Sequence, residues 1–291
     1  MTKTPLRRWA IAVLPSAAAV LAAAGCPAPP PRGTSSAVQT TATTRATTTP
    51  VVAPKVELLE PEILHEYPHD RQAHTQGVEM FDGVLLESTG QVGRSSLRAT
   101  EMTTGRVLRQ IDVPEPLYAM GITVVPDVGV WQLTWRDGVA MLRDPRTLAE
   151  IRRVRYGGQG WGACFDGTRL ITSDGMDRLI VRNPRTFDRT GEIRVTHPGS
   201  NRVGELNELE CAGNTLWANV WLHDQVLRID LPTGKVTAVA DVRRLKKIER
   251  PTGAEDVLNG IAALPGTDEF LLTGKHFGQT FHIRWKAKEN R

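Results

Sequence analysis

The signatures of several enzyme classes are missing from this 291-residue sequence. It contains no GxSxG nucleophile elbow, no glycine-rich phosphate loop and no HExxH helix, which disfavours serine hydrolysis, phosphoryl transfer and zinc-dependent hydrolysis. The seven histidines are scattered, with His65 and His69 as the only close pair, and no spacing matches a zinc site. We therefore expect neither a metal ion nor another cofactor.

A large excess of charge of one sign is also missing. The formal net charge of +4 falls to +1 once three N-terminal cations, Lys3, Arg7 and Arg8, are set aside. A nearly neutral chain provides no electrostatic basis for binding nucleic acid. We expect no nucleic-acid partner.

Cysteine is scarce, with three residues in the whole chain. Cys164 and Cys211 each lie in a short apolar run. Counted from the starts of the strands predicted there, the two positions have opposite parity and should face opposite sides. We therefore expect two buried free thiols, with a disulfide as the alternative.

The N-terminal segment has the composition of an export signal. Residues 1–25 combine the three cations with an apolar stretch from Trp9 to Ala24, and the small residues before Cys26 resemble a lipoprotein cleavage box. Residues 26–54 are rich in Pro, Thr, Ser and Ala, which predicts a disordered tether. We expect a monomeric, exported cell-envelope lipoprotein, anchored to the membrane by a lipid on Cys26, with one domain over residues 55–291. Plain secretion and an uncleaved anchor are the alternatives.

The remaining chain repeats a unit of four short runs, each typical of a strand. The first run of each unit is apolar and opens near a glycine or asparagine; these runs start at Thr75, Ala119, Gly160, Leu206 and Leu258. Turns containing Gly, Asp or Asn separate the first run from a second, and most third runs close with a threonine turn. Four strands in each of five units predict an all-β fold, a five-bladed β-propeller.

The fifth unit stops after its third run, at Trp285. The missing strand is available at the other end of the domain, over Val56–Tyr67. We predict that this N-terminal strand completes the last blade and so removes an open sheet edge. One or two helical turns are expected over Val242–Arg250.

Polar and aromatic residues recur at one end of the predicted inner strands. Equivalent positions of the first runs hold Gln76, Met120, Trp161, Asn207 and Asn259. The ends of the second runs hold Glu87, Trp135, Asp174, Trp221 and Lys275. Such residues often fill turns and pack between blades, but three tryptophans at one rim favour a pocket for a small ligand with apolar and amide groups.

Several strings are specific enough to indicate a family. PHDRQAHTQG, LLESTGQVGRSSLR, QLTW, GWG, TSDG, LNELE, WANVW, DVLNGIA and LTGK occur in this order between Val56 and Trp285. In these segments the chain resembles the plant-type and bacterial glutaminyl cyclases. The resemblance implies a five-bladed propeller that converts an N-terminal glutamine of a peptide or protein into pyroglutamate and releases ammonia.

The same resemblance assigns roles to the residues at the rim. Gln76 and Asn207 would hold the amine and amide of the substrate, and Lys275 would stabilise the developing oxyanion. The indole rings would form the walls; they belong to Trp135, Trp161 and Trp221. Glu208, Glu210 and Asp174 are secondary candidates.

The sequence departs from the family pattern at three positions. The glutamate that transfers the proton in the family aligns with Met120, which neither donates nor accepts a proton. His74 stands where the family has Phe, and Gln159 stands where many members have an acid. One hypothesis is an active cyclase that uses His74, Glu87 or another acid at the rim. The alternative is a catalytically silent propeller that binds peptide N-termini, and a purely structural envelope protein is a third possibility.

Overall fold

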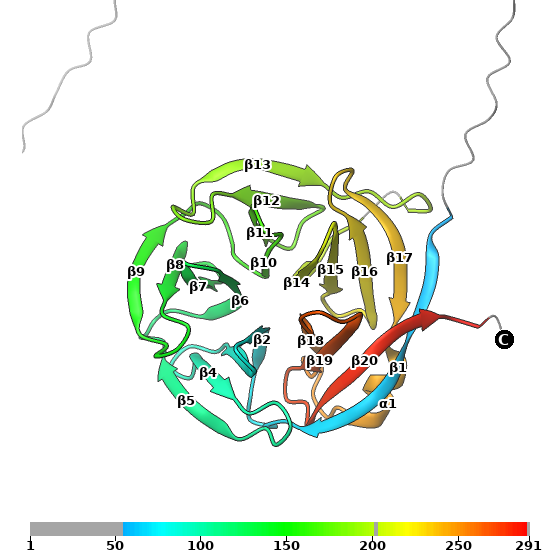
Figure 1. Cartoon of the computed structure of the whole chain (residues 1–291), viewed down its shortest axis with the longest axis horizontal. Helices are drawn as coiled ribbons and strands as arrows, with labels where there is room; N and C mark the ends of the chain where they lie inside the picture. Colours follow the sequence, from blue (N-terminus) through cyan, green and yellow to red (C-terminus); the bar gives the residue numbers. More distant parts are fainter. Residues whose placement is uncertain (1–54, 201–202, 290–291) are drawn as a thin grey trace, which may run out of the picture. The chain divides into compact units, whose positions relative to one another are not determined.

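The computed structural model describes residues 55–200 and 203–289, which form twenty strands and one short helix. The predicted export signal and the whole predicted tether, with Cys26, lie outside these residues. The sheets are arranged around a common centre, with the first strand of each repeat nearest to it (Figure 1). The fold is all-β and propeller-like, as the repeat predicts.

Three of the sheets have four antiparallel strands each, paired in the order of the sequence. The first contains β2 (Thr75–Phe81), β3 (Val84–Thr89), β4 (Ser96–Thr100) and β5 (Val107–Asp112). The second contains β6 (Ala119–Val125), β7 (Gly129–Thr134), β8 (Val139–Arg143) and β9 (Glu150–Arg155). The third contains β10 (Ala163–Phe165), β11 (Leu170–Ser173), β12 (Arg178–Arg182) and β13 (Arg189–Arg194).

The fourth sheet has eight strands, in the order β14-β15-β16-β17-β1-β20-β19-β18. Its bounds are β14 (Leu206–Ala212), β15 (Thr215–Val220), β16 (Gln225–Asp230), β17 (Lys235–Asp241), β18 (Leu258–Ala263), β19 (Glu269–Gly274), β20 (Gln279–Ala287) and β1 (Glu57–Pro68). β1 pairs antiparallel with β20 along nearly its whole length and parallel with β17 at only three positions. The N-terminal strand therefore pairs with the C-terminal strand, as the truncated fifth unit predicts. A short helix, α1 (Arg243–Glu249), follows β17.

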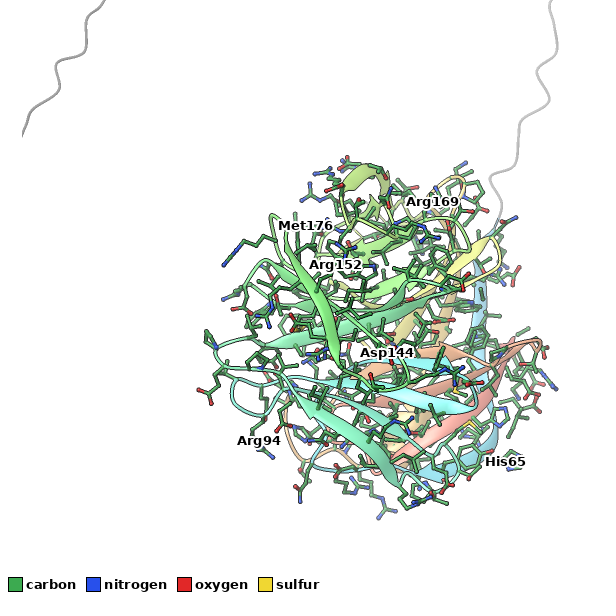
Figure 2. The ribbon with its side chains drawn as sticks, turned by 60° about the vertical axis from the view of Figure 1, so that its left-hand side comes forward. His65, Arg94, Asp144, Arg152, Arg169 and Met176 are labelled. Atoms are coloured by element: carbon green, nitrogen blue, oxygen red, sulfur yellow. A yellow bond between two sulfur atoms is a disulfide. The ribbon has the colours of Figure 1, made fainter. Side chains whose placement is uncertain are left out.

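Burial falls from the centre of the sheets to their outer edge. Every residue of β7 is buried, whereas β9 in the same sheet is almost entirely exposed. Continuous apolar runs suit strands covered on both faces, and the charged outer strands suit a solvent-facing edge. Charged side chains such as Arg94 and Arg152 extend from the surface (Figure 2). Within the described residues, no helix is both long enough and apolar enough to cross a membrane.

The threonine turns of the repeat are closed by side-chain hydrogen bonds. The Oδ1 atom of Asp144 accepts the backbone N–H groups of Arg146 and Thr147, at 2.9 and 2.7 Å. Asn183 makes the equivalent pair of bonds, at 2.8 and 3.1 Å, in the next sheet. Asp and Asn favour turns because their side chains replace a backbone acceptor in this way. Asp144 marks one such turn in Figure 2.

The expectation of free thiols is wrong, because Cys164 and Cys211 form a disulfide with a Cα–Cα distance of 5.4 Å. Cys164 lies in β10 and Cys211 in β14, which belong to different sheets. Neighbouring sheets that stack contact each other through opposite faces, the front of one and the back of the next. Side chains at positions of opposite parity in β10 and β14 therefore point toward each other across the space between the sheets.

Candidate active site

Close backbone contacts between the inner strands set the geometry of the site. A Cβ atom on Gly77 would lie 2.8 Å from the Cα of Gly121, and one on Gly121 would lie 2.7 Å from the Cα of Gly162. A Cβ atom on Gly162 would lie only 2.1 Å from the carbonyl oxygen of Asn207. Glycine is required here because a side chain would force these strands apart. In each inner segment, the residue directly before the closely packed position is one of the predicted site residues: Gln76, Met120, Trp161, Asn207 and Asn259.

The third of these inner segments differs from the prediction. The strand β10 starts at Ala163, and Gly160 and Trp161 precede it. Their backbone N–H groups donate to the carbonyl oxygens of Trp135 and Ser173, at 3.0 Å each. Trp161 is thus fixed by bonds to neighbouring segments without being part of the ladder.

Gln76 is the centre of a buried polar cluster. Its Nε2 group donates to Nδ1 of His74 at 3.0 Å and to the hydroxyl oxygen of Tyr118 at 3.2 Å. Its Oε1 atom accepts a hydrogen bond from Nδ2 of Asn259 at 3.3 Å. These bonds hold the amide of Gln76 in one orientation.

His74 is buried and neutral at pH 7. Burial and the positive charges of Lys275 and His276 lower its pKa to about 3. Because Nδ1 accepts the amide of Gln76, the proton of the neutral ring lies on Nε2. The carboxylate of Glu255 lies 3.8 Å from that nitrogen.

Lys275 directly follows β19, and its backbone N–H donates to the carbonyl oxygen of Val257 at 2.9 Å. Its side chain is buried, with 7% exposure. Burial lowers the pKa of its ammonium group to about 8, although the negative charge of Glu255 acts in the opposite direction. Within the described residues, no ion pair or hydrogen bond occupies this ammonium group. It is therefore a buried cation without a hydrogen-bond or ion-pair partner among the described residues.

The three predicted wall residues are all half-buried. Trp161 and Trp221 meet edge to face, with ring centroids 5.7 Å apart. Trp135 packs against Tyr118 at 5.6 Å, and the guanidinium group of Arg136 lies 3.9 Å from the centre of its ring. Each indole leaves part of its surface uncovered, as a binding wall requires.

Met120 connects the two aromatic groups. It is buried and belongs to the same apolar cluster as Tyr118, Trp135 and Trp161. The side-chain oxygen Oδ1 of Asn207 is buried and has no hydrogen-bond partner in the described part of the chain. A buried acceptor without a partner is unusual and is available to a donor on a ligand.

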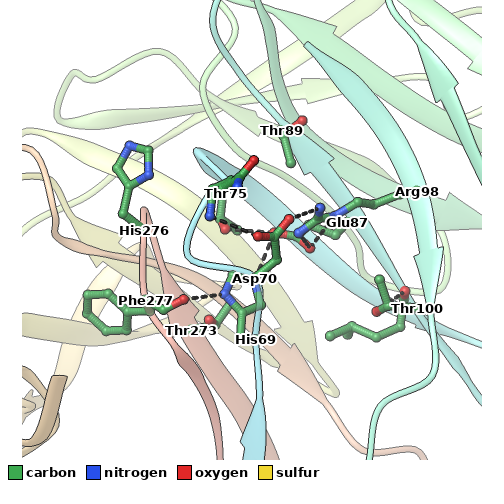
Figure 3. A network of polar contacts seen from close by, with 12 residues as sticks. His69, Asp70, Thr75, Glu87, Thr89, Arg98, Thr100, Thr273, His276 and Phe277 are labelled. Carbon is green, nitrogen blue, oxygen red and sulfur yellow. Dashed lines mark hydrogen bonds and ion pairs between the residues drawn. The ribbon is translucent and has the colours of Figure 1, made fainter. Parts of the chain in front are cut away.

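Glu87, one of the acids considered at the rim, is held in a closed network (Figure 3). Its carboxylate accepts hydrogen bonds from Thr75 at 2.7 Å, His69 at 3.0 Å and Arg98 at 2.8 Å. Arg98 also donates to Asp70 at 2.8 Å. Burial alone would raise the pKa of Glu87, but the charges of His69 and Arg98 outweigh it and lower the pKa to about 2. Its partners thus leave Glu87 poorly suited to proton transfer.

The secondary candidates are also engaged elsewhere. Asp174 forms an ion pair with Arg178 at 2.9 Å. Glu208 and Glu210 are buried and Glu79 is half-buried, and loss of solvent around the carboxyl groups raises the pKa of all three. They form an interior acidic group that contacts none of the predicted wall residues through a hydrogen bond or ion pair among the described residues.

The structure thus joins His74, Gln76 and Asn259 by hydrogen bonds, places Lys275 near His74, and joins Trp161 to Trp221 by ring contact. Sequence reasoning missed the contributions of Tyr118 and Glu255. Tyr118 was visible as a hydroxyl-bearing ring beside Met120, but Glu255 belongs to a loop without a recognisable motif. In residues 55–200 and 203–289, no group of His, Cys, Asp and Glu side chains is arranged to hold a metal ion.

Two open hollows lie on the outer surface, with volumes of about 790 and 1140 Å³. The smaller is lined by residues such as Gly175, Glu205 and His223, and the larger by residues around α1, such as Arg243 and Lys247. None of the predicted site residues lines either hollow. The candidate site is therefore defined by the converging contacts at the centre.

Known proteins resemble this chain in both sequence and structure. A family model described as glutamine cyclotransferase matches residues 34–285. A glutaminyl-peptide cyclotransferase of Arabidopsis thaliana is 32% identical over 232 residues, which cover 78% of this chain and 72% of the plant protein. The crystal structure of Myxococcus xanthus glutaminyl cyclase matches with a TM-score of 0.76 and 32% identity, over 81% of this chain and 100% of that one.

Proposed function

Because the chain belongs to the glutamine cyclotransferase family, we propose that it is a glutaminyl-peptide cyclotransferase. It converts the N-terminal glutamine of a peptide or protein into pyroglutamate and releases ammonia, without a cofactor. This proposal is supported by the burial of Gln76, Asn207 and Lys275 at the ends of inner strands, together with the edge-to-face contact of the half-buried Trp161 and Trp221. An uncharged amide substrate suits such a site, which has aromatic walls and few polar groups.

The chemistry requires the α-amine of the substrate to attack the side-chain amide carbon. Negative charge then develops on the amide oxygen, and the buried ammonium group of Lys275 is suited to stabilise it. The free acceptor Oδ1 of Asn207 and the amide of Gln76 are suited to orient the N–H groups of the substrate. These groups provide binding, orientation and oxyanion stabilisation.

Met120 removes one contribution to the rate. General acid–base catalysis typically contributes about 10²- to 10⁴-fold, and a thioether cannot take part in it. The reaction is nevertheless intramolecular, and the α-amine has a pKa of about 7.7–8.0, so that part of the substrate is neutral at physiological pH. Turnover can therefore proceed without a proton-transferring group at position 120.

A second candidate function follows from the same substitution. A silent relative that binds peptide N-termini would keep the indole walls, Gln76, Asn207 and Lys275 and would tolerate Met120. The burial of Met120 in the apolar cluster against which Tyr118 and Trp161 pack supports this alternative, because an apolar side chain contributes to a binding surface and not to proton transfer.

The propeller-like fold has five blades in this proposal. The eight-stranded sheet then consists of two blades, β14–β17 and β18–β20 with β1. The short parallel pairing of β1 with β17, compared with its long antiparallel pairing with β20, supports this division. Four strands in each blade agree with the three separate four-stranded sheets.

The protein acts outside the cytoplasm in this proposal, as a monomeric lipoprotein anchored through Cys26. The predicted signal over residues 1–25 and the tether over 26–54 support export. The disulfide between Cys164 and Cys211 supports it independently, because such bonds persist in oxidising compartments. Labelling of the expressed protein with a radioactive fatty acid, compared with a Cys26→Ala variant, tests the anchor.

Ammonia release from a glutaminyl dipeptide by the purified full-length protein tests the activity. An N-acetylated glutaminyl dipeptide is the control substrate, because its blocked amine cannot attack. Ammonia and pyroglutamate in equal amounts from the free dipeptide alone support the proposal. Quenching of tryptophan fluorescence by the dipeptide without ammonia release supports the binding function instead.

A further inference from the structure

Because Met120 cannot transfer a proton, another group must do so in an active enzyme. Four of the described acids near the site are already held by other contacts. Glu87 is held by three donors and Asp174 by Arg178, as described above. Asp137 accepts the backbone N–H of Tyr118 at 3.1 Å. Asp256 accepts two backbone N–H groups of its own loop, at 3.0 and 2.7 Å. Each of these carboxylates has a structural role.

Glu255 differs from them because its side chain is free of such bonds. The carboxylate is 71% exposed, and among the described residues its one polar side-chain contact is with Nε2 of His74, at 3.8 Å. Its charge also acts on Lys275 and Tyr118, whose pKa values it raises. An exposed carboxylate without a hydrogen bond among the described residues therefore lies 3.8 Å from His74 and acts electrostatically on two further groups of the site.

The loop between α1 and β18 brings Glu255 to this position. Asp256 closes a turn over Thr252 and Gly253, and the carbonyl oxygen of the next residue, Val257, accepts the backbone N–H of Lys275 at 2.9 Å. The loop is thus attached to the residue that would stabilise the oxyanion. Its backbone is fixed, whereas the side chain of Glu255 remains free to turn toward a substrate.

We propose that Glu255 is the proton carrier of the cyclisation, in the role that Met120 cannot fill. The inference rests on the proposed cyclotransferase function. As the bond between the α-nitrogen and the amide carbon forms, the carboxylate accepts a proton from the α-nitrogen. It then gives this proton to the amide nitrogen, the bond between that nitrogen and the carbon breaks, and ammonia leaves. The carboxylate is regenerated, and no other reactant is needed.

His74 has a positioning role in this scheme. With Nδ1 bonded to Gln76, the N–H on Nε2 faces the carboxylate and attracts it toward the site. The neutral ring is a weak base, since burial and neighbouring charges oppose its protonation. Replacement of His74 should therefore reduce the rate less than replacement of Glu255.

The decisive experiment compares kcat and KM for a glutaminyl dipeptide across five forms of the full-length protein. Glu255→Gln should lower kcat about 10²-fold or more, with KM changed less than about threefold, because general acid–base catalysis is lost while binding remains. Asp268→Asn is the matched control, since Asp268 is similarly exposed and lies outside the site. In a Met120→Glu background, adding Glu255→Gln should change kcat less than about threefold, because the family carboxylate is then present.

The outcomes separate this inference from the proposed function. If the wild type turns over and Glu255→Gln retains kcat within about threefold, the role of Glu255 is refuted while the cyclotransferase function stands. If the wild type releases no ammonia, both proposals fail together. Equal losses from Glu255→Gln with and without Met120→Glu would also refute the proposal, because they would indicate a structural role.

Discussion

Removal of the disulfide between Cys164 and Cys211 should destabilise the domain by several kcal/mol. The two residues are separated by 47 positions. The chain-entropy relation for a loop of this length gives roughly 4 kcal/mol, because the crosslink restricts the unfolded chain. Urea unfolding of the oxidised protein, the reduced protein and a Cys164→Ala/Cys211→Ala variant measures this difference. A shift of the midpoint by about 1 M or more is expected for both altered forms.

The reduced protein is the control for packing in this experiment. Cys164 is 1% exposed, so that replacing it with alanine also removes buried atoms, whereas reduction leaves both sulfur atoms in place. The double variant should therefore be slightly less stable than the reduced protein. Midpoints that agree within about 0.3 M for all three forms would refute the entropic argument.

Three further predictions concern the site and its support. Met120→Glu should change kcat, measured as ammonia release, by less than about threefold, since Glu255 already transfers the proton; an increase of about 10²-fold would contradict this. Lys275→Ala should lower kcat about 10²-fold and abolish the decline in rate above about pH 8, because the wild-type ammonium group is charged below its pKa of about 8 and lost above it. Glu87→Gln should cost about 3–5 kcal/mol in denaturant unfolding at pH 7, because it removes the buried charge that pairs with His69 and Arg98 and leaves Arg98 with Asp70 alone. The pKa of Glu87 is lowered to about 2 in the fold, so its contribution is present above about pH 4.3 and is lost as pH falls toward 2. A variant with wild-type acid sensitivity would argue against the last point.

The sequence predicted the fold well because the repeat is periodic. Apolar runs at fixed spacing, separated by turn residues, specify strands by local chemistry alone, and four of the five predicted inner runs begin where their strands begin. The exception starts at Ala163 instead of Gly160, because backbone groups before it bond to neighbouring segments. These hydrogen bonds depend on segments elsewhere in the chain, so the pattern of residues around Gly160 cannot predict them.

The disulfide and the role of Glu255 were not predicted for related reasons. Strand parity describes the faces of one sheet, whereas Cys164 and Cys211 lie in two stacked sheets. Glu255 approaches His74 from a loop far away in the chain. Residues such as Gln76, in contrast, occupy equivalent positions in successive repeats, and alignment of the repeats was enough to bring them together.

The pairing of β1 with β20 determines when folding can finish. β1 is among the first parts of the domain to be synthesised, and its longest partner is the last strand. At about 5–20 residues per second, the interval between the two is on the order of 10 to 45 seconds. During that time β1 is an unpaired strand with an unused edge, which another chain can bind. The beginning of the domain therefore keeps an open edge until its end is available, and the β1–β20 ladder cannot form before the rest of the domain has been synthesised.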